Sequence, residues 1–310
     1  MKKQNKWKII LVVLMLLITT GCTTTLMDKN KKPVKNPETG QSLTQNILCQ
    51  PTAPETIKKY EENKVDIKKL PSCTEFKINS GGYEGLWTSI FVKPLAFIIL
   101  WIGKYINSFG LSLIIVSLAI RLIAYPITKK TALQSELIKK AKPDIDRIEA
   151  KYKNKTDQDS LMKKSQEMTL VYKKYNISPL SGCLYAFLQL PLFIAFLEAI
   201  NRVPAIFEEK FLFLQLGTTP MVGFGTSQWW MYAILMLAIA ASTFYSFKMN
   251  ATATSAEAGM KQMPYIMSGM IILMALFMPA ALGLYWIATN AFTIVQNLIV
   301  KRSKLVNEKA

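Results

Sequence analysis

Long apolar blocks dominate the pattern of hydrophobic and polar positions along the chain. A helix that crosses the hydrocarbon core of a membrane needs about 20 mostly apolar residues, and four blocks reach that length. The last block, Met263 to Val300, has 38 residues; as one helix it would be about 57 Å long, roughly twice the thickness of the core. Pro279 and Gly283 mark a break inside it. The pattern therefore predicts five transmembrane helices, at 108–128, 179–200, 227–247, 263–280 and 282–300.

The start of the chain has the layout of a bacterial targeting segment. A basic stretch precedes the apolar residues 9–18, which are too few to cross a bilayer, and small residues then lead to Cys22. We interpret 1–21 as a lipoprotein signal peptide, after whose removal Cys22 is lipidated and becomes the N-terminus. A simple signal anchor in which Cys22 keeps an ordinary thiol is the alternative.

Residues 22–84 are polar and rich in proline, and no apolar periodicity runs through them. They are expected to form an extracytoplasmic linker or a small irregular region. Cys49 and Cys73 lie in this segment, outside the reducing cytosol. The sequence leaves open whether the two cysteines form a disulfide or remain free thiols.

The stretch 85–107 is apolar but contains Lys93, Pro94 and Lys104. Its uninterrupted apolar part is too short to span a membrane. We therefore predict an amphipathic helix that lies on the outer face of the membrane. Three aromatic residues are expected at the level of the lipid headgroups: Trp87, Trp101 and Tyr105.

Charge predicts how the helices are oriented. Residues 129–178 carry 13 Lys and Arg against seven acids, residues 201–226 carry two of each, and the tail 301–310 has four basic residues. Because cytoplasmic segments carry the excess of Lys and Arg, 129–178 and the tail are placed in the cytoplasm and 201–226 outside. Five spans then put the loop 248–262 in the cytoplasm and residues 22–84 outside, as cleavage at the lipoprotein signal also requires.

The segment 129–178 is predicted to be a helical hairpin. Apolar residues recur at spacings of three and four from Leu133 to Tyr152, and a polar turn at 154–159 precedes a second helix. Pro143 interrupts the first helix, so a kink or a restart is expected there. The charged surface of the hairpin is either a solvated face beside anionic lipid or a docking surface for a partner. Charge alone does not separate the two.

Composition narrows the class of protein. The chain has 38 Lys and Arg against 20 Asp and Glu, a formal charge of +18, yet 51% of its residues are hydrophobic and its mean hydropathy is +0.21. A nucleic-acid binder or a disordered basic tail would be more polar. There is no His, which removes His-based triads and most zinc sites.

Catalytic motifs are also missing from the sequence. There is no phosphate-binding loop and no metal-ligand spacing, and Cys183 stands alone in an apolar stretch. We therefore expect no catalytic residues, no metal and no cofactor, and predict that the chain is not an enzyme.

Arg121 is the strongest functional signal because it lies inside a predicted span. An Arg at the centre of a membrane costs about 2.5–3.5 kcal/mol even on the lower insertion scale. No acidic residue lies at mid-depth in another span, since Glu198 falls near the outer end of its helix and is expected to be exposed at the interface. Snorkelling to the interface would be a long reach. We infer a water-filled cavity in the helix bundle that solvates Arg121.

Other polar residues lie within the predicted spans: Gln189, Ser242, Thr243, Ser246, Asn290, Thr293 and Gln296. Single polar residues in membranes more often form interhelical hydrogen bonds than substrate contacts. Gln189 is as well placed to line a cavity with Arg121 as to bond a neighbouring helix. For the remaining residues the packing role is favoured.

These features resemble the YidC membrane insertases, relatives of the mitochondrial oxidase-assembly insertase. The resemblance covers about residues 85–300, and the lipoprotein signal with five mature spans resembles the Gram-positive form of the family. The residues that carry it are the Arg121 span from Gly110 to Lys129, Ser178-Pro-Leu-Ser-Gly-Cys183, Gln189-Leu-Pro191, and Leu282-Gly-Leu-Tyr-Trp286 followed by Asn290.

The resemblance implies an all-α integral membrane fold. Five transmembrane helices would form a hydrophilic groove that opens to the cytoplasm and the lipid, with an outer interfacial amphipathic helix and a cytoplasmic helical hairpin. Four residues would line the substrate groove: Arg121, Gln189, Trp286 and Asn290. The implied function is insertion and folding of small or single-span membrane proteins, alone or with the Sec translocon.

The implied partners are nascent membrane proteins, the Sec translocon, membrane lipids and, weakly through the basic tail, the ribosome; no nucleic acid is expected. The implied location is the bacterial cell membrane, with the lipid-anchored N-terminus outside and the C-terminus in the cytoplasm. A small-solute transporter or channel is the main alternative, and it would favour internal repeats or intramembrane acids, which the sequence lacks. A non-inserting assembly factor for membrane complexes is a second alternative.

Overall fold

The computed structural model describes residues 23–178, 181–250 and 263–307. The predicted signal peptide 1–21 and its Cys22 lie outside these residues, as does most of the loop predicted at 248–262. The chain divides into two compact units. The first unit comprises Met1–Val116, Leu190–Met236 and Ala275–Tyr285, and the second comprises Ser117–Gln189, Leu237–Met274 and Trp286–Ala310.

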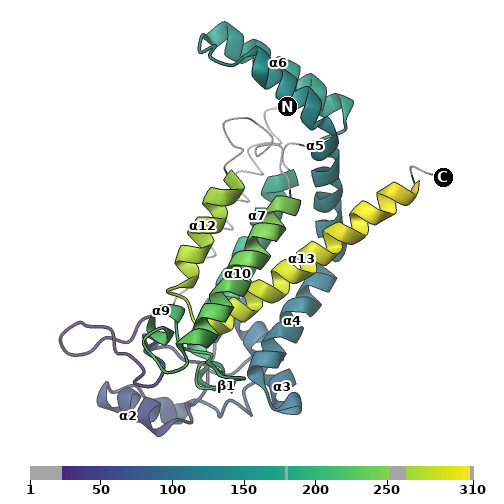
Figure 1. Ribbon diagram of the computed structural model, residues 1–310. Helices are drawn as coiled ribbons and strands as arrows, with labels where there is room; N and C mark the ends of the chain where they lie inside the picture. Colours follow the sequence, from purple (N-terminus) through teal and green to yellow (C-terminus); the bar gives the residue numbers. More distant parts are fainter. Residues whose placement is uncertain (1–22, 179–180, 251–262, 308–310) are drawn as a thin grey trace. The chain divides into compact units, whose positions relative to one another are not determined.

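Helices make up most of the regular structure in the described residues (Figure 1). The α-helices are α2 (Pro54–Glu62), α3 (Lys93–Ile106), α4 (Phe109–Ile123), α5 (Tyr125–Lys151), α6 (Gln158–Lys174), α7 (Ser181–Arg202), α8 (Pro204–Phe207), α9 (Pro220–Gly223), α10 (Trp229–Met249), α12 (Met263–Ala275) and α13 (Ala280–Asn307). The short helices are a 3-10 turn, η1 (Ile67–Lys69), and a π-helical turn, η2 (Thr88–Val92). The strands β1 (Lys210–Phe211) and β2 (Leu214–Gln215) form an antiparallel pair.

All five predicted spans contain a helix, namely α4, α7, α10, α12 and α13. By length and composition, two helical stretches of the described residues can cross a membrane, Thr88–Ile106 and Trp229–Met249; the bent pair α4–α5 makes a third if it is one span. The structure is therefore that of a mostly helical membrane protein with two or three candidate spans. The count of five remains a prediction. So does the interfacial position of 85–107, because that stretch is itself long and apolar enough to cross.

The break between the last two predicted spans covers residues 276–279 and includes Pro279. Helix α12 ends at Ala275 and α13 begins at Ala280, so Gly283 lies inside α13 and not in the turn. The first N–H groups of a helix have no partner within the helix, and here Ala280 N donates to the carbonyl oxygen of Thr218 at 2.9 Å. The loop 201–226 therefore caps the start of α13.

The bend between α4 and α5 is located at Ala124, where the chain turns by 71°. Pro126 lies in the first turn of α5. Proline is favoured there because its missing N–H is not needed and its fixed φ suits a helix start. The restart expected at Pro143 is wrong: α5 runs through that residue to its end. The alternative of a kink at Pro143 stays a prediction.

Helices α5 and α6 pack against each other to form a hairpin, with α6 beside the C-terminal part of α5 (Figure 1). Asp157 caps α6, because its side chain accepts a hydrogen bond from Ser160 N at 2.9 Å. Apolar side chains fill the interface at helical spacing. The buried members are Ile138, Ala141, Ile145, Ile148, Tyr152, Met168, Val171 and Ile177.

We expect acid to loosen this hairpin. Lys174 donates to Asp144 at 2.8 Å, and Lys151 pairs with Glu167. These hydrogen bonds lower the pKa of both carboxyl groups. Because their folded pKa lies below the unfolded value, the stabilisation is present above about pH 4 and is lost as the pH falls through the folded pKa. Hydrogen exchange of α5 and α6, corrected for the intrinsic rate, should rise on acidification. The double variant Asp144→Asn/Glu167→Gln should show a smaller rise, and an equal rise would contradict the assignment.

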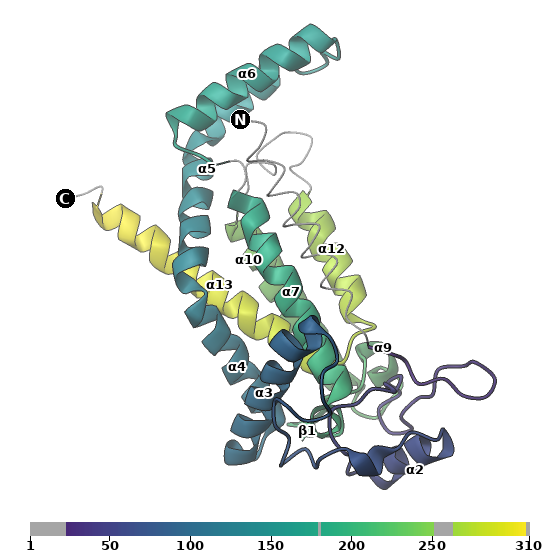
Figure 2. The ribbon, with the colours of Figure 1, turned by 180° about the vertical axis from the view of Figure 1, so that it is seen from behind.

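Residues 23–84, which we call the N-terminal module, have a hydrophobic core. Of the two alternatives that the sequence left, a linker and a small irregular region, the structure adopts the second, packed around a core. The core combines apolar residues of the module with Phe207 from α8; its buried members are Leu26, Val34, Leu43, Ile47, Tyr60, Ile67 and Phe207. Tyr60 donates to the carbonyl oxygen of Thr44 at 2.9 Å, and burial raises the pKa of its phenol. Most of these residues lie in loops and short helices, so the sequence shows no helical or strand periodicity from which the core could be predicted. Figure 2 shows α2 with the loops of the module.

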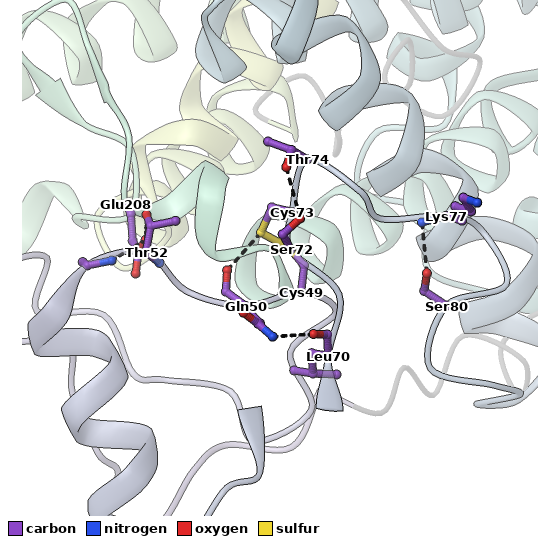
Figure 3. Close-up of a disulfide and its surroundings, with 11 residues drawn as sticks. Cys49, Gln50, Thr52, Leu70, Ser72, Cys73, Thr74, Lys77, Ser80 and Glu208 are labelled. Carbon is purple, nitrogen blue, oxygen red and sulfur yellow. Dashed lines mark hydrogen bonds between the residues drawn. A yellow bond between two sulfur atoms is a disulfide. The ribbon is translucent and has the colours of Figure 1, made fainter. Parts of the chain in front are cut away.

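A disulfide between Cys49 and Cys73 closes the N-terminal module (Figure 3). The disulfide alternative left open by the sequence is therefore the one the structure adopts. Beside it, Gln50 donates from its side chain to the carbonyl oxygen of Leu70 at 2.6 Å, and its N–H bonds to Pro71. The disulfide links the segment before α2 to the segment after η1, and these two segments are not paired in a regular sheet.

Removal of this disulfide should destabilise the N-terminal module by about 3 kcal/mol, because the bond restricts the unfolded chain over a separation of 24 residues. The expected result for Cys49→Ser/Cys73→Ser is much faster proteolysis within 23–84 under native conditions, reproduced by reducing the parent protein. Cys183→Ser is the control and should leave the rate unchanged. Equal protection of the double variant would show that the module is held by its core and its contacts with α7 and α8.

A buried charge cluster fastens α7 to other parts of the first unit. We call it the Arg202 cluster; its charged members are Glu84, Lys93, Glu198 and Arg202. Arg202 is fully buried, pairs with Glu84, and donates from Nε to the carbonyl oxygen of Asn46 at 2.7 Å. Its Nη1 lies 3.9 Å from Glu198, and Lys93 Nζ lies 3.2 Å from Glu84. Each buried charge therefore has an oppositely charged neighbour, as burial requires.

The Arg202 cluster corrects the expected positions of two residues. Glu198 and Trp87 were expected at an exposed interface, and both are buried. Glu198 accepts a hydrogen bond from Trp87 Nε1 at 2.8 Å. A polar group can leave water when segments distant in the sequence supply its partners, which a local hydropathy pattern does not reveal. Trp101 and Tyr105 are exposed on α3 with their rings 5.0 Å apart, as expected of an outward face.

Candidate functional site

Arg121 lies near the C-terminal end of α4 and faces the interior of its unit. Its exposed fraction is 3%, whereas the following residues Leu122 and Ile123 are 66% and 79% exposed. Successive residues of a helix point in directions about 100° apart, so one face of the helix end is apolar and open and the other holds the guanidinium. Arg121 therefore does not reach outward along the helix surface.

The structure brings Arg121 and Gln189 into contact through one hydrogen bond between α4 and α7. The Arg121 Nη2 group donates to the side-chain oxygen of Gln189, which is half-buried in α7. An amide oxygen is an uncharged acceptor, so this bond orients the guanidinium without neutralising it. In a region of low dielectric, a cation held in this way attracts anionic groups and carbonyl dipoles strongly.

Trp286 and Asn290 form a second set of contacts, centred on Thr243 of α10. Trp286 Nε1 and Asn290 Nδ2 each donate to Thr243 Oγ1 at 3.0 Å. Thr243 is buried, while Trp286 and Asn290 are half-buried. These bonds join α13 to α10, so Trp286 and Asn290 each use a side-chain N–H group to hold the two helices together.

Thr128 and Gln296 make a further polar contact that sequence reasoning did not find. Thr128 Oγ1 donates to Gln296 Oε1 at 2.9 Å, which links the first turn of α5 to α13, and both residues are buried. Nearby on α13, Asn297 donates to Asn250 at 3.1 Å. Gln296 could be recognised as a polar residue in a span, but the hydroxyl of Thr128 lies at the margin of an apolar block and gives no separate signal.

The chemistry available at these contacts is binding and solvation. In the part of the chain that the structure describes, no group of three His, Cys, Asp or Glu side chains is arranged to hold a metal ion. Cys183 lies in the first turns of α7, in a stretch whose side chains are outside the description. The contacts described above involve the Arg121 guanidinium, the amides of Gln189 and Asn290 and the hydroxyl of Thr243, which are groups that can bind a ligand or water by hydrogen bonds.

The fold and these contacts define a helical integral membrane protein that keeps a cation and several amide and hydroxyl groups inside its helices. The family model described as "60Kd inner membrane protein" matches residues 101–308. Among curated proteins, the membrane protein insertase YidC of Oceanobacillus iheyensis is 33% identical over 248 residues, covering 77% of this chain and 93% of that protein. The membrane protein insertase MisCA of Bacillus subtilis is 34% identical over 217 residues, covering 69% of this chain and 79% of that protein.

A solved structure, the active YidC insertase with its first transmembrane domain resolved, matches with a TM-score of 0.52 and 23% identity. The match covers 78% of this chain and 52% of the other, so this chain spans about half the length of that protein, and the likeness concerns the fold alone. The chain belongs to the YidC family of membrane protein insertases. Membership confirms the resemblance and the prediction that the chain is not an enzyme.

Proposed function

We propose that this chain inserts small or single-span membrane proteins through a hydrophilic groove formed by five transmembrane helices. Membership in the insertase family supports the activity. The buried Arg121 and its bond to Gln189 are the observation that supports a polar groove within the helices. A solute transporter is disfavoured by the same family membership.

In this proposal the groove shortens the apolar path of a polar segment. Moving a polar or charged segment through hydrocarbon is costly, and a water-lined cavity is allowed at membrane depth when it faces the protein interior. Arg121 would transiently attract an acidic tail or backbone carbonyl groups of the substrate. The substrate helix would then leave along exposed apolar residues of α10 and α13, such as Leu237 and Val295. Burial of that helix in lipid supplies the driving force.

The proposed orientation places the N-terminal module outside the cell and the hairpin α5–α6 with the tail 301–310 in the cytoplasm. The excess of basic residues in 129–178 supports the cytoplasmic side. The disulfide supports the outer side, because disulfides persist in oxidising compartments. A lipid anchor on Cys22 and an interfacial position of 85–107 complete the arrangement.

Nascent membrane proteins are the proposed substrates, and the Sec translocon and the ribosome are proposed partners. The hairpin α5–α6 would serve as the cytoplasmic recruitment element, and the basic residues of the tail, with Lys301 and Arg302 exposed, would contact the ribosome weakly. A role in folding membrane proteins after insertion is part of the same proposal.

Site-specific crosslinking tests the proposed substrate path. A small photoreactive residue at Ser117, one turn before Arg121 and buried on the same helix, keeps Arg121 in place. We expect a covalent adduct with ribosome-bound nascent membrane protein from position 117. The neighbouring position 118, where Leu118 is exposed, is the matched control and should give a weaker adduct. A variant at 117 that still inserts substrate without forming an adduct would rule out the groove as the path.

A further inference from the structure

The β1–β2 hairpin, which we call the 210–215 finger, carries an apolar tip. The strands pair Lys210 with Gln215 and Phe211 with Leu214, so that Leu212 and Phe213 form a two-residue turn. These two side chains are 72% and 61% exposed. Turns that face water are normally polar, and a run of four apolar residues at an exposed turn is unusual.

The backbone of the turn makes the choice of residues more unusual. Leu212 has φ of +56°, in the left-handed region, while Phe213 is not among the residues of positive φ. A tight hairpin turn with positive φ at its first central position normally has Gly there. Leu at this position accepts a backbone conformation that glycine would adopt freely, and it adds a large exposed apolar side chain. Both features are unfavourable in water.

Helix α4 holds one side of the finger in place. The Glu209 carboxylate accepts hydrogen bonds from Phe109 N at 2.6 Å and Gly110 N at 3.2 Å, so it caps the first turn of α4. A β-carbon at Gly110 would come within 2.5 Å of the Phe211 ring, so only glycine leaves room for this ring against α4. The finger is thus fixed at the N-terminal end of α4.

Helix α10 borders the tip of the finger. The Phe213 ring centroid lies 6.3 Å from that of Trp230, in the first turn of α10, and Trp229 and Trp230 are both exposed. Helix α10 is long and apolar enough to cross a membrane, and tryptophans at the ends of such helices lie at the headgroup level. Phe213 packs against Trp230, so the tip of the finger lies beside the tryptophans at the start of α10.

We propose that the 210–215 finger is an interfacial lipid anchor. Leu212 and Phe213 enter the boundary between headgroups and acyl chains in the leaflet reached by the N-terminal end of α10, and the exposed Lys210 lies at the level of the lipid phosphates. Two side chains are far too small a surface for a stable protein interface, which buries about 800 Å² on each partner. The apolar surface is instead continuous with the lipid-facing start of α10. This proposal depends on α10 crossing the membrane and not on the insertase mechanism.

Spin labelling of the full chain measures the depth of the tip. The parent protein is the Cys183→Ser variant with its disulfide intact, reconstituted in vesicles of phosphatidylethanolamine and phosphatidylglycerol. Leu212→Cys carries the label at the tip, and Lys58→Cys, exposed on α2 of the N-terminal module, is the control. The parent without an added cysteine measures background labelling. At each position, the relaxation of the spin label by molecular oxygen, which concentrates in lipid, is compared with its relaxation by a water-soluble nickel complex.

Oxygen should relax the label at position 212 more strongly than the nickel complex, and the order should reverse at position 58. A water-like ratio at 212 in a protein that is folded and reconstituted would overturn the proposal. A label at 212 that is immobilised and shielded from both reagents would also overturn it, because that result indicates a protein contact. Phe213→Asp should shift the ratio at 212 towards the aqueous value, since a carboxylate on the same tip resists entry into lipid.

Discussion

Replacement of Arg121 by Glu is expected to reduce insertion of a single-span substrate with an acidic N-tail at least about tenfold. At a few ångströms and an effective dielectric constant of about 20, reversing one charge changes an interaction by several kcal/mol, and about 1.4 kcal/mol is already tenfold. Arg121 is buried and donates to the amide oxygen of Gln189, so the Glu variant places a negative charge in the same interior position. Protease protection of the inserted substrate in vesicles provides the measurement.

The series Arg121→Lys and Arg121→Ala separates charge from shape. Lys keeps the positive charge but loses the planar guanidinium, so it should retain part of the activity, whereas Ala should lose most of it. Lys58→Glu is the matched control for the change in net charge, because Lys58 is exposed on α2. If Arg121→Glu inserts the substrate as well as the parent, the positive charge is not the basis of the site.

Replacement of Arg202 by Leu should lower the stability of the first unit by about 3–5 kcal/mol. Removing the cation from a buried ion pair leaves the carboxylate buried without its counter-charge, and here that carboxylate is Glu198, because Glu84 keeps Lys93 as a neighbour. Arg202 is fully buried between Glu84 and Glu198, and it also loses its bond to Asn46. Thermal unfolding of the purified protein in detergent should show a clearly lowered midpoint.

Two variants sharpen the Arg202 test. Arg147→Leu removes an exposed arginine that lies 3.7 Å from Asp144, and it should leave the midpoint nearly unchanged because exposed ion pairs contribute little. Adding Glu198→Gln to Arg202→Leu removes the stranded charge, since Glu198 is buried and pairs with Arg202, and it should restore part of the loss. No restoration would mean that the cost of Arg202→Leu comes from lost packing of its long side chain.

The helices could be predicted from the sequence because an apolar block is a local property of the chain. Arg121 was recognisable for the same reason, since a lone Arg stands out against an apolar background. A bond between Arg121 and Gln189 could be considered from the sequence because polar side chains inside a membrane form hydrogen bonds between helices. Thr243 was expected to pack between helices, but its partners Trp286 and Asn290 could not be named, because they depend on which faces of α10 and α13 meet.

The N-terminal module and the Arg202 cluster could not be predicted, because their contacts join distant parts of the chain. Trp87 and Glu198 are separated by 111 residues, and Glu84 and Arg202 by 118. Counted as single residues, these charges indicate solvent exposure. The core of the module likewise includes Phe207, which no analysis of residues 22–84 alone could supply.

The participation of Phe207 in that core has a consequence for the order of synthesis. Gln41 of the module also donates to Asn201 at 2.6 Å, and Leu48 N bonds to Arg202 O at 2.8 Å. The module is therefore made earlier than α7 and α8 but can be completed only after both helices have been made. Until then its core lacks Phe207, so the module closes only after residues 85–207 have joined the chain.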